Sequence, residues 1–232
     1  MINSTLAPGP LLALLHLCDS LFPIGGFGYS DGLEAATAAG LVKTPADLQA
    51  WLDVCLDEVV GRTDGPAVLR TWSAFGRRDW DAICGLDEEI TAMRPAAATR
   101  RSSRAMGRRL VTTWSALYLD GRLEHVLDLA RRERLGLTLP IAFGCACASA
   151  GVEMRDAGVA FAYTRLASTI SAALRLMRIG QTDAHARLAE TLTRVPAVVD
   201  AMVTRARPES FAPAMDVAAM AQQYLHSRLF RS

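Results

Sequence analysis

The residues with the most unusual chemistry lie in segment 19–34, DSLFPIGGFGYSDGLE, where adjacent glycines follow a proline. A helix must end before Pro23, and Gly25 and Gly26 permit backbone angles that are closed to other residues. A glycine-rich loop of this kind can hold a phosphate group. The sequence nevertheless has no Walker A pattern, and the nearest lysine is Lys43, which argues against a nucleotide-binding loop.

Two interpretations of this segment remain. It is either a tight corner between helices with buried aromatic rings, or a partner-binding surface that displays Phe27 and Tyr29. In both cases Ser30 or Asp31 is expected to cap a new helix that starts after the corner.

Metal binding and nucleophilic catalysis find little support in the sequence. The four histidines have no HxH or HxxxH spacing. Cys145 and Cys147 stand two residues apart in an apolar stretch, and on a helix their side chains point about 200° apart. Ser30 and Ser149 lack a nucleophile-elbow context. We therefore expect no catalytic residue, no resident metal and no cofactor, and the residues give no positive evidence for an enzyme.

A run of basic residues occupies positions 100–109, RRSSRAMGRR. Arg100, Arg104 and Arg108 recur every four residues and share one helical face. The run predicts either a surface that binds nucleic acid or an acidic protein, or a solvated face paired with acids elsewhere. Gly107 costs about 1 kcal/mol relative to alanine inside a helix, which indicates close packing there.

The C-terminal segment 224–232, YLHSRLFRS, is unusually apolar for a terminus. Leu229 and Phe230 lie between Arg228 and Arg231 and form a compact anchor. This anchor is expected to dock either in a partner's groove or on the chain's own body.

Helical periodicity positions all of these residues, and no alternating strand or hairpin signal is present. In one helix Thr44 is the expected N-cap, Pro45 the first residue and Asp47 part of the first turn. The predicted fold is all-α, a single-domain helical bundle of about ten helices over residues 1–232 with a tail near 225–232. The expected helices cover 9–20, 31–39, 45–60, 65–76, 79–92, 96–119, 122–134, 139–150, 155–179, 183–205 and 214–229. The apolar face expected of the last one consists of Val217, Ala221, Tyr224, Leu225 and Arg228.

Composition limits the class of protein. The chain has 232 residues, of which 51% are hydrophobic, so a disordered chain is excluded. Its formal net charge of +1 argues against a general nucleic-acid binder. Five cysteines without a CxxC pair favour a reducing compartment. The uncharged run 135–152 contains Pro140 and three glycines, so it predicts a buried helix rather than a membrane span. We expect a cytoplasmic location and no membrane partner.

Together these segments resemble the urease accessory protein UreF family, in the right order over nearly the whole chain. The corner and the tail are the most specific parts of the resemblance. Its residues are Asp19 to Phe27, Tyr29-Ser30, Gly32-Leu33-Glu34, Arg101-Ser102, Gly107-Arg108, Pro140, Phe143-Gly144, Ser171-Ala172-Ala173, Arg175-Leu176, Gly180-Gln181-Thr182-Asp183 and Ser227 to Ser232. The chain departs from the family at Arg178-Ile179, where Pro-Leu is common, and at Gln222-Gln223, where His-Glu is common.

The resemblance implies an all-α homodimer without catalytic activity. Such proteins join UreD (also called UreH) and the GTPase UreG on apo-urease and promote GTP-dependent insertion of the nickel centre. By the same resemblance the partner-binding residues are Phe27, Tyr29, Ser30, Arg228, Leu229, Phe230, Arg231 and Ser232. The structural motif positions are Pro23, Gly25, Gly26, Gly107, Gly180 and Gln181. The alternative is a helical regulatory domain that binds nucleic acid or a ligand.

Overall fold

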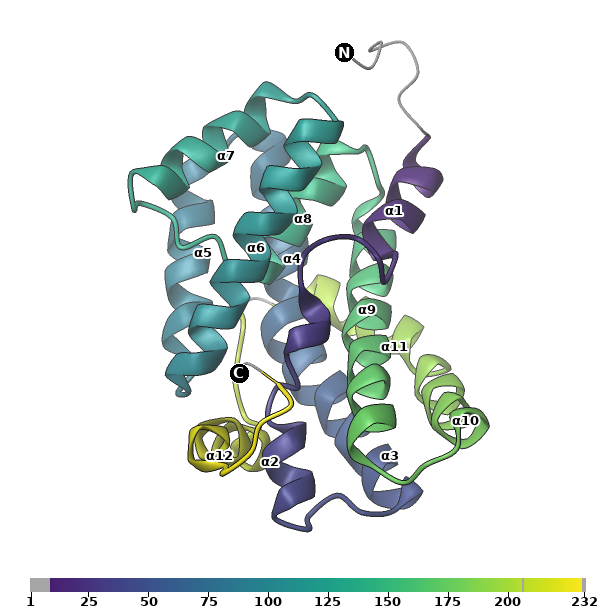
Figure 1. The fold of residues 1–232 in the computed structure, drawn as a ribbon. Coiled ribbons are helices and arrows are strands. Elements are labelled where there is room, and N and C mark those ends of the chain that lie inside the picture. Colours follow the sequence, from purple (N-terminus) through teal and green to yellow (C-terminus); the bar gives the residue numbers. More distant parts are fainter. Residues whose placement is uncertain (1–8, 206, 231–232) are drawn as a thin grey trace.

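The computed structural model describes residues 9–205 and 207–230 (Figure 1). This part of the chain is helical and contains no β-strand, so the all-α prediction is confirmed. None of its helices is both long and apolar enough to cross a membrane. The helices in chain order are α1 (Pro10–Cys18), η2 (Gly26–Gly28), α2 (Leu33–Ala38), α3 (Pro45–Val54), η3 (Cys55–Asp64), α4 (Gly65–Arg77), α5 (Trp80–Ala92), α6 (Ala97–Leu117), α7 (Gly121–Arg131), α8 (Leu139–Ser149), α9 (Met154–Leu176), α10 (Gln181–Leu192), α11 (Val195–Thr204), α12 (Pro213–Ala221) and η4 (Gln222–Tyr224).

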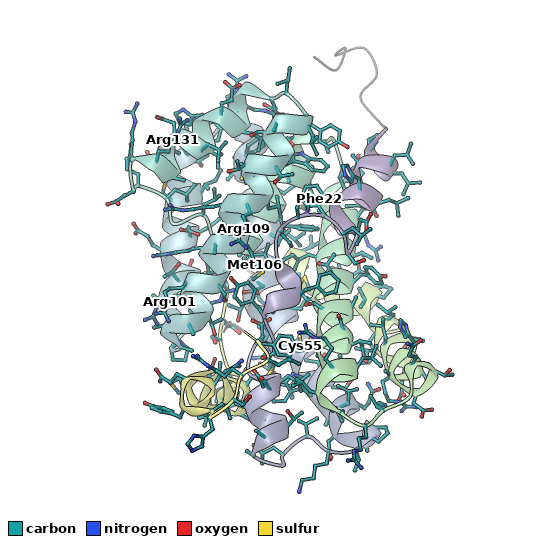
Figure 2. All side chains as sticks on the ribbon, in the orientation of Figure 1. Phe22, Cys55, Arg101, Met106, Arg109 and Arg131 are labelled. Carbon is teal, nitrogen blue, oxygen red and sulfur yellow. The ribbon has the colours of Figure 1, made fainter. Side chains whose placement is uncertain are left out.

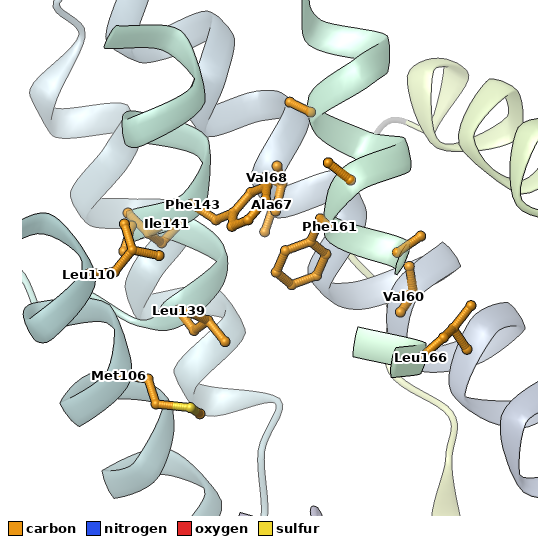
Figure 3. Packing of buried hydrophobic residues seen from close by; sticks show 14 of the residues in the cluster. Val60, Ala67, Val68, Met106, Leu110, Leu139, Ile141, Phe143, Phe161 and Leu166 are labelled. Carbon is orange, nitrogen blue, oxygen red and sulfur yellow. The ribbon is translucent and has the colours of Figure 1, made fainter. Parts of the chain in front are cut away.

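The core is built around α8, which packs against α4 and α6 and is buried from Leu139 to Cys147. This confirms the buried helix predicted from the uncharged run. Gly144 lets the helices approach closely, since a Cβ there would lie 2.7 Å from the carbonyl oxygen of Val68 on α4. Phe143 of α8 and Phe161 of α9 meet edge to face at 5.3 Å between ring centroids, in the packed interior of Figure 3.

Helix α3 begins as predicted. The Thr44 side chain accepts a hydrogen bond from the Asp47 amide, Asp47 accepts one from the Thr44 amide, and Pro45 is the first residue. The expected connection at 61–64 is wrong, because the chain remains helical as η3, a π-helix from Cys55 to Asp64 that leads directly into α4. Gly65 fits tightly there, since a Cβ would lie 2.5 Å from the Val60 carbonyl oxygen.

The long helix expected over 183–205 is two helices, α10 and α11. Pro196 explains the break, because proline has no amide hydrogen and is accommodated in the first turn of a new helix. Arg194 at this break forms ion pairs with Asp53 and Asp57 on the α3–η3 helix. These pairs hold the bend against the neighbouring helix.

The last helix is shorter than expected and buries a different face. Helix α12 ends at Ala221, and the chain is no longer helical after Tyr224. Its buried side carries Met215 and Ala218, and Gln222 of η4 is buried too, whereas Val217 is 61% and Tyr224 of η4 80% exposed. The predicted face therefore points mostly outward, since Met215 and Ala218 pack into the core instead and Gln222 is buried through its hydrogen bond to Glu34 of α2.

Gly107 packs closely, as predicted, but against a loop rather than a helix. A Cβ at Gly107 would lie 2.1 Å from the Leu137 carbonyl oxygen in the loop that precedes α8. Asp87 holds the same loop, because its carboxylate accepts hydrogen bonds from the amides of Leu137 and Thr138. The Thr138 hydroxyl also donates to it, at 2.7 Å.

Candidate partner-binding site

The glycine-rich segment forms a tight corner on the same side of the molecule as α6 and the C-terminal segment (Figure 1). Gly25 adopts a positive φ of 77°, which explains the need for glycine there. Arginines from two helices hold the corner by its carbonyl groups. Arg109 of α6 donates to the Ile24 carbonyl oxygen at 3.4 Å, and Arg175 of α9 donates to that of Phe27 at 2.7 Å. The Phe27 ring remains 53% exposed.

Neither Ser30 nor Asp31 caps α2, so this expectation is wrong. The N-cap is Gly32, whose φ of 90° suits glycine and which makes no side-chain cap. A Cβ at Gly32 would lie 2.8 Å from the backbone nitrogen of Ala219, so α12 approaches the chain here directly. Ser30 and Asp31 instead make long-range contacts, with Gln222 and with Arg165.

Glu34 is the centre of the site. It is 6% exposed, and its carboxylate accepts hydrogen bonds from the Gln222 side chain at 2.8 Å and from the Phe230 amide at 3.3 Å. The amide of Leu229 donates to the other carboxylate oxygen. The Ser30 hydroxyl donates to Gln222 at 3.1 Å, which orients the amide of that fully buried residue. A buried carboxylate therefore holds the tail through donors that compensate its desolvation.

The two apolar residues of the tail have different surroundings. Phe230 is 3% exposed, and the guanidinium of Arg175 stacks over its ring at 4.3 Å. Leu229 is 54% exposed and Arg228 is also exposed. Phe230 therefore anchors the tail on the chain's own body, as one of the two interpretations predicted, while Leu229 stays at the surface and docking in a partner's groove remains a prediction. Arg231 and Ser232 lie outside the described residues.

Beneath α12 lies a cavity of about 90 Å³ lined by charged groups. Asp31 pairs with Arg165, and Asp64 pairs with Arg94. Burial lowers the pKa of Arg165, but Asp31, Cys55 and Asp64 outweigh it and raise that pKa overall. Burial raises the pKa of Cys55 to about 11, so this thiol stays protonated at neutral pH. The first of these pairs connects the corner, through Asp31, to α9.

The structure brings the corner and the tail together but separates the other predicted positions. Pro23, Gly25 and Gly26 shape the corner, while Tyr29 is partly buried against the core. Gly107 supports the loop before α8, and Gly180 and Gln181 start α10.

Sequence reasoning missed Gln222 and Arg175 as site residues, although both lie in segments that were compared with the UreF family. It also missed the role of Glu34. An acidic residue in an otherwise apolar helical turn was the available signal for Glu34.

Over residues 9–205 and 207–230, no group of three or more His, Cys, Asp or Glu side chains could hold a metal ion. The cysteines there are free, and Cys145 and Cys147 are both buried in α8, as their apolar surroundings predicted. The features that distinguish this side of the molecule are an exposed aromatic ring, a docked tail and an outward apolar face on α12. The fold and site define an all-α protein with a surface suited to docking other proteins.

Comparison with known proteins gives the family. The UreF family matches residues 42–192. The urease accessory protein UreF of Methylibium petroleiphilum is 32% identical over 96% of this chain and 94% of its own length. That of Trichodesmium erythraeum is 28% identical over 99% of both chains. The bifunctional urease accessory protein UreEF of Bordetella bronchiseptica is 32% identical over the whole of this chain, which spans 54% of that protein. The chain belongs to the UreF family.

Proposed function

We propose that this protein is a non-catalytic chaperone of urease maturation in the cytoplasm. It works as a homodimer that joins UreD/UreH and the GTPase UreG on apo-urease and promotes GTP-dependent insertion of nickel. The metal is cargo of the complex, and the GTPase supplies the nucleotide chemistry. The names of the relatives, which are urease accessory proteins, support this role.

The observation that carries the proposal is the tail held by Glu34. Phe230 anchors the tail and leaves Leu229 and Arg228 at the surface, and Arg175 joins this anchor to the corner because it contacts both the Phe230 ring and the Phe27 carbonyl oxygen. Helix α12, which packs against α2, also exposes apolar side chains such as Val217 and Met220. A basic and apolar surface supported by a buried anchor is suited to binding UreD/UreH.

The proposed effect on the GTPase UreG depends on differential binding. A scaffold influences a GTPase only when its contacts differ between the nucleotide states of that GTPase. We therefore assign UreG recruitment to the surface that the corner and the tail form together with UreD/UreH.

The first test is urease activity in nickel-supplied cells that carry the cognate operon, with this gene deleted and then restored. We expect activity to be lost and then regained. A chain without residues 228–232 is expected to fail to restore activity and to fail to co-elute with UreD/UreH. Activity that does not depend on the gene contradicts the proposed function.

A second test separates the anchor from the exposed contact. Leu229→Ala is expected to weaken UreD/UreH binding by more than about 1 kcal/mol, or about fivefold, while the tail stays docked. Phe230→Ala is expected to weaken binding and also to release the tail. Leu41→Ala is the matched control, because Leu41 is 67% exposed and lies in the turn after α2. Equal binding by the Leu229 and Leu41 variants contradicts the assignment of the tail.

A further inference from the structure

Helix α6 carries an uncompensated charge. It contains five arginines and no acidic residue. Its buried side holds Ser102, Ser103, Met106, Gly107 and Leu110, so Arg101, Arg104 and Arg108 lie along the opposite, exposed side. Residues 101 and 108 are about 10 Å apart along the helix axis, at 1.5 Å per residue. We call Arg101, Arg104, Arg108 and the flanking Arg109 the arginine stripe.

Single arginines such as Arg131 and Arg178 also lack a carboxylate partner within the described chain, but the stripe gathers four such side chains on one helix. Elsewhere many arginines pair with a carboxylate, among them Arg62, Arg132, Arg155, Arg187 and Arg194. Within residues 9–205 and 207–230, no carboxylate lies within ion-pairing distance of any member of the stripe. Arg104 lies near Asp87. The Asp87 carboxylate already accepts three hydrogen bonds, from the amides of Leu137 and Thr138 and from the Thr138 hydroxyl. Among the described residues, the stripe is therefore not neutralised by ion pairs.

The stripe is continuous with the candidate site. Arg109 donates to the Ile24 carbonyl oxygen and so connects α6 to the corner. Helix α12 also packs against α6. Figure 2 shows Arg101 and Arg109 along α6, on the side that carries the corner and the C-terminal segment. Through Arg109, the stripe thus reaches the corner that carries the exposed ring of Phe27.

We infer that the arginine stripe docks an acidic surface of a partner protein, with carboxylates spaced along about 10 Å of a helix or strand. Guanidinium groups bind carboxylates bidentately, and the exposed ring at the neighbouring corner suits a protein rather than a phosphate backbone. The near-neutral chain as a whole also disfavours nucleic acid. This inference rests on the proposed function, because the partner is one of the proteins that assemble on this face.

The test compares two triple charge reversals of the full chain. Arg101→Glu, Arg104→Glu and Arg108→Glu reverse the stripe. Arg131→Glu, Arg178→Glu and Arg207→Glu produce the same net charge at exposed, scattered positions. A glutamine version of the stripe variant checks the loss of charge without repulsion, and circular dichroism confirms that each variant is helical. The readouts are co-elution with UreD/UreH, UreG and apo-urease at low and high salt, and binding of poly-L-glutamate and random duplex DNA.

The stripe variant is expected to lose at least about tenfold in affinity for poly-L-glutamate and for the assembled partners. The glutamine version is expected to lose less affinity, and the control variant is expected to lose little. High salt is expected to weaken the wild type and to narrow this difference. Assembly of the stripe variant equal to that of the control overturns the inference, and so does binding of DNA in preference to poly-L-glutamate. If assembly is lost when residues 228–232 are deleted but not in the stripe variant, the inference about the stripe is wrong and the proposed function still stands. If the wild type does not assemble, the proposed function fails, and poly-L-glutamate binding then decides the stripe.

Discussion

At the scale of single residues, Glu34 determines where the C-terminus lies. It joins α2 to donors 188 to 196 positions later in the sequence, and two of those donors are backbone amides. A buried acceptor that serves several donors is costly to alter, because each unpaired donor keeps its desolvation penalty. The position of the tail therefore depends on one carboxylate as well as on the buried ring of Phe230.

Glu34→Gln is expected to release the tail. The replacement puts an amide NH₂ group where backbone N–H groups need an acceptor, which costs about 2 kcal/mol. We expect faster hydrogen exchange at residues 222–230, measured by mass spectrometry, and weaker binding of UreD/UreH. Glu124→Gln on the exposed side of α7 is the control. Unchanged exchange in the Glu34 variant would show that the carboxylate does not hold the tail.

Asp216 is expected to reduce stability at neutral pH. Burial raises its pKa, and Arg94 only partly opposes this. A raised pKa means that the folded state prefers the neutral acid, so stability present at low pH is lost as pH rises through the folded pKa. Asp216→Asn should therefore raise the melting temperature at pH 7 and have a smaller effect below the ordinary aspartate pKa. A larger gain in acid than at pH 7 would contradict this sign.

At the scale of helices, local signals predicted beginnings better than ends. The capping residues Thr44 and Asp47 act within one turn, so the sequence reveals them. The end of α12 depends on the distant Glu34, and the π-helix depends on packing of Gly61 and Gly65 against α11. No local pattern encodes such contacts. The apolar side chains of α12 consequently predicted the wrong buried face.

Gly107→Ala is expected to destabilise the fold by about 1–3 kcal/mol, because the added methyl group overlaps the Leu137 carbonyl oxygen. Gly85→Ala on α5 is the matched change, since nothing lies within 4 Å of a Cβ there. Its higher helix propensity should instead add up to about 1 kcal/mol. Urea denaturation measures the free energy of unfolding of both variants, and we expect it to fall for Gly107→Ala and to rise for Gly85→Ala.

At the scale of the whole molecule, the corner, the tail and α6 form one side that other proteins can reach, while α4 and α8 form the interior. The all-α class and the core helix α8 could be predicted from the sequence, whereas the role of the corner and the tail in partner binding stays a prediction. The contacts between corner and tail could not be predicted, since they join residues almost two hundred positions apart.

Hydrogen exchange should follow this division. Helices α4 and α8 make extensive mutual contacts and are expected to exchange only on global unfolding. Residues 222–230, which depend on a few polar contacts, should exchange through local opening. Exchange of all these segments at a single common rate would show that the tail is part of one cooperative unit with the core.

The attachment of the tail to Glu34 through main-chain amides has a consequence for inhibitors. A tethered segment competes at an effective concentration of about millimolar, so a free peptide copying the tail must exceed that level to displace it. The backbone donors also make the anchorage tolerant of side-chain changes at position 229, where sequence can vary to suit a partner. Small molecules aimed at the Glu34 carboxylate therefore compete with a segment that is always present, whereas ligands for the exposed side of the tail do not.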